Sequence, residues 1–432
     1  MSVLVGNLLV VQTGGGTCAA NASLAGVITQ AGRYPESIEE IYGSLNGFTG
    51  ILEGRLIDLQ EEQQSTIRAL RHTPGAALGA GSLTLDFNAD SALVAQQTTA
   101  LFRVLEANNV RFLITIGGMR TMEISRRLHE LARQRGYDLR VIAIPKSATN
   151  DIPGTDHSPG FGSAARVVAH TVREAELDML GHGEPGCSIV EVPGRLSGWL
   201  AMSAALARRG PDEAPDFILV PELGVDENAL VQHIQATIER RGACSVVVAD
   251  GVRNPQGRPF LAETVQADSV GRRLAEFIGE SIGYPAYVYE AGRLPFHAAR
   301  LASDTDLKEA YELGRDAVRS AINGQSGFML KLKRESTSPY KCTNSLVLLE
   351  DVVRARYNRL PLDQVDLARL QPTEGLRQHL LPLIQGDPEV PLDENGLPEF
   401  AQLNKVLVED LIQALEEEPP TEPANPEPTQ AA

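Results

Sequence analysis

Residues 145–165 of the chain read PKSATNDIPGTDHSPGFGSAA and follow directly on an apolar stretch at 139–144. The apolar stretch predicts a buried strand. The residues after it place a lysine, an aspartate, an asparagine and several hydroxyl side chains close together. Polar groups this dense at a strand end usually face a ligand and not a core. The segment therefore predicts a ligand site at the carboxyl end of a buried strand.

The chain before this stretch repeats a pattern of strand, glycine loop and helix. The predicted elements are a strand at 3–11, the loop TGGGT at 13–17, a helix at 20–30, a strand at 111–116, the loop GGMRT at 117–121 and a helix at 122–135. Backbone N–H groups in such loops can bind an anion where a helix begins. One loop alone is better explained as a plain tight turn between strand and helix. Two loops on neighbouring strands favour phosphate binding.

A second set of alternating strands and helices runs from 188 to 250. Alternation of this kind predicts an α/β fold with two Rossmann-like lobes, mainly parallel sheets and a cleft between the lobes. Ligands of such folds bind at the carboxyl ends of the strands. The glycine loops and the polar stretch at 145–165 all lie at predicted carboxyl ends.

Composition limits the classes of function. The chain has 432 residues and a formal net charge of −17, and no segment gathers Lys and Arg into a stripe. Nucleic acid and acidic membrane surfaces are therefore not expected as partners. The four cysteines have no metal-ligand spacing, and residues 1–11 predict a first strand and not a signal peptide. We expect a protein of the cytoplasm, without a membrane span.

The stretch at 145–165 resembles the phosphofructokinase family, whose pyrophosphate-dependent members read P-K-T-I-D-N-D at this point. The likeness extends over residues 3–335 and is nearest to the short bacterial pyrophosphate-dependent type. The further matching segments are TPGAALGA at 73–80, VEVPGRLSGWLA at 190–201, PE at 221–222 and SDTDLKEAYELG at 303–314.

The resemblance implies a division of the chain and a set of site residues. The implied segments are a phosphate-donor lobe at 1–145 completed by part of 252–330, a sugar-phosphate lobe at 146–251, return and C-terminal helical segments at 252–415, and a disordered acidic, proline-rich tail at 416–432. Donor phosphate is expected at Gly15, Gly16, Gly117, Gly118 and Arg120. Sugar phosphate is expected at Ser147, Asn150, Arg195, Glu222, Arg293 and Arg300. Lys146 and Asp151 are the candidate catalytic residues.

Several positions depart from the family pattern. Met119 stands where the family has its metal-binding aspartate, and a thioether is a poor ligand for Mg²⁺. Thr149 stands where the family has the aspartate that acts as general base, and Ser82 where it has the arginine that binds the donor phosphate. Gly186 replaces a residue that is often basic in the family. Asp151 is the nearby carboxylate that could substitute for the base.

Other positions keep two interpretations. Arg120 could bind an anion without a metal, or it could be a solvated residue at the start of a helix. Lys146 could meet a pyrophosphate oxygen or lie on the surface. Among Arg293, His297 and Arg300 the spacing does not select the sugar-phosphate ligand, and His297 can equally be an ordinary histidine.

These departures lead to three hypotheses. Losing a positioned base typically costs ~10²- to 10⁴-fold in rate. The first prediction is therefore a catalytically impaired family member that binds a sugar phosphate or a phosphate anion, as a sensor or as a regulatory subunit for an active paralogue. The alternative is an active 6-phosphofructokinase using pyrophosphate or ATP and Mg²⁺, which is the only reading that needs a cofactor. A third is an assembly scaffold. A homo-oligomer, either a dimer or a tetramer, is expected under all three.

Overall fold

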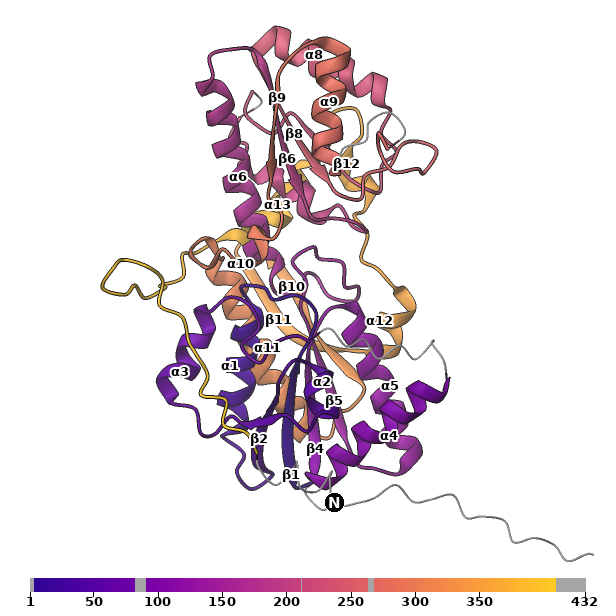
Figure 1. The fold of residues 1–432 in the computed structure, drawn as a ribbon, viewed down its shortest axis with the longest axis vertical. Helices are drawn as coiled ribbons and strands as arrows, with labels where there is room; N and C mark the ends of the chain where they lie inside the picture. The colour runs from indigo at the N-terminus through magenta and orange to yellow at the C-terminus, as the bar shows by residue number, and fades with distance from the viewer. Residues whose placement is uncertain (1–3, 82–90, 211, 263–267, 409–432) are drawn as a thin grey trace, which may run out of the picture.

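A computed structural model describes residues 4–81, 91–210, 212–262 and 268–408. Two of the predictions above, on Ser82 and on the tail at 416–432, lie outside the described residues. Figure 1 shows two lobes stacked along the long axis of the molecule, each built around a sheet.

The first lobe contains a seven-stranded sheet in the order β11-β10-β5-β4-β1-β2-β3. The strands β1, β2, β4, β5 and β10 run parallel, while β3 and β11 pair antiparallel at the two edges. Both faces of the central strands are buried, which is why their sequences are continuous apolar runs. The strands are β1 (Gly6–Gln12), β2 (Ile38–Ser44), β3 (Leu56–Asp58), β4 (Val110–Gly117), β5 (Arg140–Pro145), β10 (Phe328–Thr337) and β11 (Tyr340–Leu348).

Helices cover both faces of this sheet (Figure 1). One buried cluster joins the sheet to α1 (Ala20–Ala31), α3 (Gln64–Ala69) and α11 (Asp304–Ile322). A second cluster joins the opposite face to α2 (Phe48–Leu52), α4 (Ser91–Ala107) and α5 (Met119–Arg135). A third, smaller cluster packs α12 (Leu349–Ala355) beside α5.

The second lobe contains a parallel four-stranded sheet in the order β7-β8-β6-β9. A single large core joins this sheet to its helices. The elements are α6 (Phe161–Gly181), β6 (Gly186–Val192), α7 (Trp199–Ser203), β7 (Phe217–Leu219), α8 (Glu227–Arg241), β8 (Ala243–Ala249), α9 (Val270–Ile282) and β9 (Ala286–Glu290). The predicted fold class is confirmed: both lobes are α/β and mainly parallel.

The chain crosses between the lobes more than once. Strand β9, which lies in the predicted return segment, pairs in the second sheet. After α10 (Leu294–His297) the chain enters α11 and the first sheet, and it then returns to the second core through α13 (Glu374–Leu380). Residues 386–408 form no helix and run back along the first lobe, where Val408 donates a backbone hydrogen bond to Leu56 at 3.0 Å.

Helix α5 begins earlier than the sequence pattern predicts. Met119 and Arg120 lie in its first turn and not in the preceding loop. Gly118 is extended, and its carbonyl accepts a hydrogen bond from the backbone of Thr121 at 2.9 Å, so the helix starts directly after the glycines. Within the described part of the chain, no helix is long and apolar enough to cross a lipid bilayer.

Candidate active site

The loops after β1, β4 and β5 meet at one edge of the first sheet. Lys146, just after β5, donates a backbone hydrogen bond to Gly117 at 2.9 Å, and its Nζ donates to the carbonyl oxygen of Gly15. A Cβ placed on Gly14 would lie 3.8 Å from that Nζ and 3.9 Å from the backbone nitrogen of Gly118. The structure therefore brings the two glycine loops and Lys146 together.

Glycine is required where these loops approach each other. A Cβ on Gly117 would lie 2.0 Å from Oγ1 of Thr121 and 2.6 Å from Oγ1 of Thr13, and those two hydroxyls share a hydrogen bond. Gly14 has a φ of +66°, which favours glycine. Gly14 and Gly15 remain exposed, so a ligand can reach the loop backbone.

The second lobe contributes a cation to the same place. Arg293, in the turn after β9, has its Nη2 3.9 Å from where a Cβ on Gly15 would lie. His297, at the end of α10, has its Cε1 3.2 Å from the corresponding position on Gly16. The carboxyl ends of β1 and β9 therefore face each other across the two lobes. Arg293 thus lies against the predicted donor loop, although it was predicted to bind the sugar phosphate, and Arg300 is exposed on the following short 3₁₀ helix.

Burial shapes the charges of this site. Lys146 is only 7% exposed. Burial lowers the pKa of its amine to about 8, and the negative charge of Asp151 partly opposes that shift. Burial and the Arg293 guanidinium together lower the pKa of His297. At neutral pH the site therefore presents Lys146 and Arg293 as cations.

The polar stretch after Lys146 forms a small network of hydroxyl and carboxylate groups. Ser147 donates a hydrogen bond to Oδ1 of Asp151, and its hydroxyl lies 3.2 Å from that of Thr149. Asp151 and Thr149 are partly exposed. The carboxylate that was expected to replace the missing base therefore lies beside the altered base position.

Asn150 shapes this loop from the inside. It is buried, has a φ of +56°, and accepts a hydrogen bond on its Oδ1 from the backbone of Ser158 at 2.9 Å. Its carbonyl accepts another from the side chain of Asn358 at 2.9 Å. These two hydrogen bonds hold the loop that carries Thr149 and Asp151, and the role of Asn150 toward a sugar phosphate stays a prediction.

The second lobe contributes two carboxylates, Glu222, which the sequence analysis named, and Asp250, which it missed. The oxygens of Glu222 accept backbone hydrogen bonds from Gly198 and Leu360 at 2.9–3.1 Å, so this carboxylate fixes two loops. Asp250, directly after β8, accepts from the backbone of Gly194 at 2.9 Å. Burial raises the pKa of Asp250, and the neighbouring Arg195 partly opposes the shift. A carboxylate directly after a predicted strand was the signal that could have identified it.

The predicted metal position does not fit Mg²⁺. Met119 packs against an apolar cluster that includes Met122, Ile152 and Val352. Arg120 donates to Glu123 at 3.1 Å. Across the described ranges, no group of three or more His, Cys, Asp or Glu side chains could hold a metal ion. The residues at this position therefore offer hydrocarbon and sulfur where Mg²⁺ requires oxygen.

The position in the second lobe where family members often have a basic residue is Gly186 in this chain, and it leaves no room for a side chain. Gly186 is buried, and a Cβ there would lie 2.8 Å from the carbonyl oxygen of Pro285 and 2.9 Å from the methyl group of Met179. A longer side chain would require a backbone shift. Pro193, which stands where the resembled M-G-R motif has methionine, directly follows β6.

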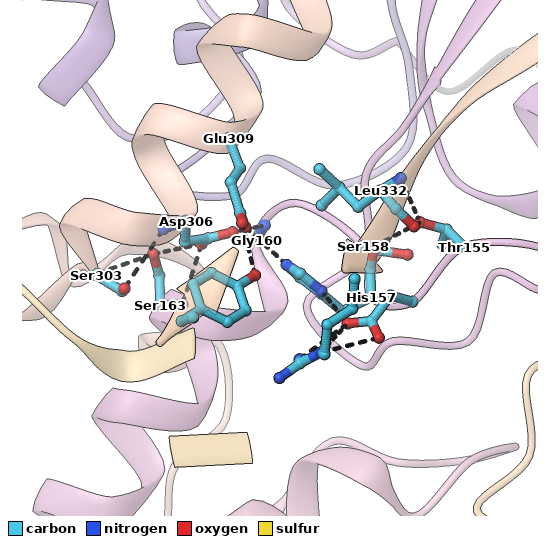
Figure 2. Close-up of polar contacts among 12 residues, drawn as sticks. Thr155, His157, Ser158, Gly160, Ser163, Ser303, Asp306, Glu309 and Leu332 are labelled. Carbon is cyan, nitrogen blue, oxygen red and sulfur yellow. Dashed lines mark hydrogen bonds and ion pairs between the residues drawn. The ribbon is translucent and has the colours of Figure 1, made fainter. Parts of the chain in front are cut away.

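A buried network of charges holds the polar stretch in place (Figure 2). His157 lies between two carboxylates, with Nδ1 2.7 Å from Asp156 and Nε2 2.7 Å from Glu309 of α11. Burial alone would lower the pKa of His157, but the two carboxylates raise it to about 9, so the imidazole is charged at neutral pH. Hydrogen bonds from His157 and Arg334 outweigh the effect of burial on Asp156 and lower its pKa.

Asp306 attaches the start of α6 to α11. Its carboxylate accepts backbone hydrogen bonds from Gly160 at 2.8 Å and Ser163 at 3.0 Å, and one from the Ser163 hydroxyl. Figure 2 shows Asp306 turned toward both residues. The segments 145–165 and 303–314, far apart in sequence, are therefore bonded to each other.

Comparison with known proteins identifies the family. The Phosphofructokinase family profile matches residues 7–318. The chain belongs to the phosphofructokinase family. It is 36% identical over 413 residues to a pyrophosphate–fructose 6-phosphate 1-phosphotransferase of Halomonas elongata, covering 93% of this chain and 97% of that protein. The family resemblance drawn from the motifs is confirmed, as is its nearness to the pyrophosphate-dependent type.

Two further similar proteins are a solved structure and a curated relative. A crystal structure of a pyrophosphate-dependent phosphofructokinase from Marinobacter aquaeolei superimposes with a TM-score of 0.85 at 30% identity, covering 94% of this chain and 98% of that one. A sulfofructose kinase of Alkalicoccus urumqiensis is 32% identical over 360 residues, covering 81% of this chain and 89% of that protein. The proteins to which this chain is similar thus differ in the sugar that their names give.

Proposed function

We propose that this chain is a pyrophosphate-dependent phosphotransferase acting on fructose 6-phosphate, the alternative that the sequence analysis placed second. The observation that carries the proposal is the meeting of both glycine loops, Lys146 and Arg293 at facing carboxyl ends of the two sheets. The similarity to pyrophosphate-dependent enzymes over nearly the whole chain supports the same activity.

The residues suggest a division of labour. Lys146, Arg293 and the loop N–H groups would hold the two phosphoryl groups of pyrophosphate, because charge-assisted hydrogen bonds to phosphate are strong. The 1-hydroxyl of the sugar would attack the nearer phosphorus, form the new O–P bond and release inorganic phosphate. Asp151 would accept the hydroxyl proton, since its carboxylate lies beside the altered base position at Thr149.

A second candidate is the impaired, ligand-binding protein. Met119 in an apolar cluster and Thr149 in place of a carboxylate favour it, because they remove two groups that the resemblance assigns to catalysis. Under this proposal the site binds pyrophosphate or fructose 6-phosphate, turnover is absent, and the protein acts through its bound state.

One assay separates the two candidates. Formation of fructose 1,6-bisphosphate from fructose 6-phosphate and pyrophosphate is measured at high enzyme concentration with Mg²⁺, and the reverse reaction is measured with inorganic phosphate. We expect turnover that falls at least ~10²-fold in Asp151→Asn and in Lys146→Ala. The control is Arg240→Gln, an exposed arginine on α8 that pairs with Asp212. Absent turnover in a folded protein that still binds pyrophosphate would select the second candidate.

A further inference from the structure

The position after the second glycine loop is built as part of a hydrophobic core. Met119 contacts the cluster of Met122, Ile152 and Val352, whose side chains are at most 1% exposed. The cluster connects α5, α12 and the polar stretch after β5. Its shape depends on apolar packing, so Met119 has a structural role of its own at the place where the resemblance predicts a metal ligand.

The carboxylates near the glycine loops already have partners. Asp151 accepts from Ser147, and Glu123 accepts from Arg120. Neither lies in a group of metal-ligating side chains within the described residues. The charge at the loops is instead positive, and it comes from Lys146 of the first lobe and Arg293 of the second.

The two cations are arranged as a pair across the first loop. Lys146 is almost completely buried under it, with Nζ close to Gly14 and Gly15, while Arg293 approaches Gly15 from the other lobe. An ammonium group offers three donors and a guanidinium group five. Among the described residues the Lys146 amine donates one hydrogen bond, to Gly15, which leaves donors for an anion at the loop.

We propose that this site binds inorganic diphosphate as the metal-free anion, with Lys146 and Arg293 supplying the positive charge that a divalent ion supplies elsewhere. The inference rests on the proposed function for the choice of ligand. It extends that function by assigning charge neutralisation to two side chains, one from each lobe.

The test is titration calorimetry of the full-length protein with sodium diphosphate, once in EDTA and once with Mg²⁺. We expect the dissociation constant in EDTA to be equal to or lower than that in Mg²⁺, with a tolerance of about threefold. In EDTA, Lys146→Ala and Arg293→Gln should each weaken binding at least about tenfold, which corresponds to the loss of one charge-assisted hydrogen bond. Arg240→Gln, on α8, should bind like the unmodified protein.

The outcomes separate the inference from the proposed function. Binding that requires Mg²⁺ would overturn the inference and leave the proposed function intact. Absence of binding in both buffers would overturn both. Because Arg293 is exposed, its variant should fold, and unchanged binding by folded Arg293→Gln in EDTA would also overturn the inference.

Discussion

At the scale of single residues, the charge of Lys146 makes ligand binding depend on pH. Its pKa is lowered to about 8 by burial, so the amine loses its proton as the pH rises through that value. We expect the affinity for diphosphate to fall between about pH 7.5 and pH 9.5. Calorimetry across this range measures the effect.

The matched variant for this prediction is Lys146→Arg, because a guanidinium stays protonated throughout. Titration of the diphosphate itself is common to both proteins, so the comparison isolates the lysine. An equal pH dependence in the two proteins would contradict the assignment.

Met119 and Thr149 allow a second test at this scale. The double variant Met119→Asp with Thr149→Asp restores both carboxylates of the resembled pattern. We expect at most weak gain of Mg²⁺-dependent turnover, because Met119 packs in an apolar cluster and Gly186 leaves no room for a basic side chain. The lost packing should cost about 1–3 kcal/mol of unfolding free energy.

The measurements are turnover and chemical denaturation. Met119→Leu keeps the apolar contact and serves as the control, with a change below about 1.5 kcal/mol. Full recovery of turnover in the double variant would show that the scaffold needs only these two carboxylates.

At the scale of elements, α1 and α11 pack so closely that glycine is needed at their crossing. A Cβ on Gly26 of α1 would lie 2.1 Å from the carbonyl oxygen of Tyr311, and a Cβ on Gly314 of α11 would lie 2.1 Å from that of Ser23. We expect Gly26→Ala to lower the unfolding free energy by about 1–3 kcal/mol through overpacking.

Gly279→Ala provides the opposite result in the same kind of element. Gly279 lies inside α9, and a Cβ there meets no atom within 4 Å. Alanine should therefore stabilise the protein by about 0.5–1 kcal/mol, since glycine is the poorer helix former. Denaturation curves of both variants test the pair, and stabilisation by Gly26→Ala would show that the two helices can separate without cost.

At the scale of the whole molecule, the charged network around His157 connects parts of both lobes. Asp156 and His157 belong to the polar stretch, Glu309 to α11 and Arg334 to β10. Arg334 also donates to the carbonyl oxygen of His379 at 2.9 Å, and His379 lies in α13, which packs into the core of the second lobe.

This network should make stability depend on pH. The pKa of His157 is raised from 6.5 to about 9, so its contribution is complete below pH 6.5 and is lost as the pH rises through about 9. We expect the unfolding free energy to fall over that interval, by on the order of 3 kcal/mol at most. The other groups facing the imidazole are the carboxylates of Asp156 and Glu309, with Arg334, Tyr340 and His379 beyond them.

Denaturation of the unmodified protein and of His157→Gln between pH 6 and pH 9.5 gives the measurement. The variant should be less stable at pH 6 and should show a smaller decrease toward pH 9.5. Parallel curves would mean that the histidine is neutral in the folded protein.

Self-association stays a prediction at this scale. Light scattering of the purified chain should give the mass of a dimer or tetramer, because the resemblance implies association through these lobes. A mass of 46.5 kDa would instead identify a monomer.

Local sequence patterns are enough to predict the fold class and most of the loops that form the site. Buried parallel strands need continuous apolar runs, and strand-to-helix turns need glycine, so both features are local and visible along the chain. The motifs at 145–165 and 303–314 also identified the family.

The hydrogen-bond partners of the polar side chains become visible in the folded chain alone. Glu222 and Asn150 stay predicted sugar-phosphate ligands, and the structure adds that their oxygens accept backbone hydrogen bonds from distant loops. Arg293 lies against the donor loop, and Asp250 lies beside Arg195. The physical reason is that a carboxylate or amide must satisfy its hydrogen bonds with whatever the folded chain brings near it. Those partners are contributed by other elements and are not recorded in local sequence.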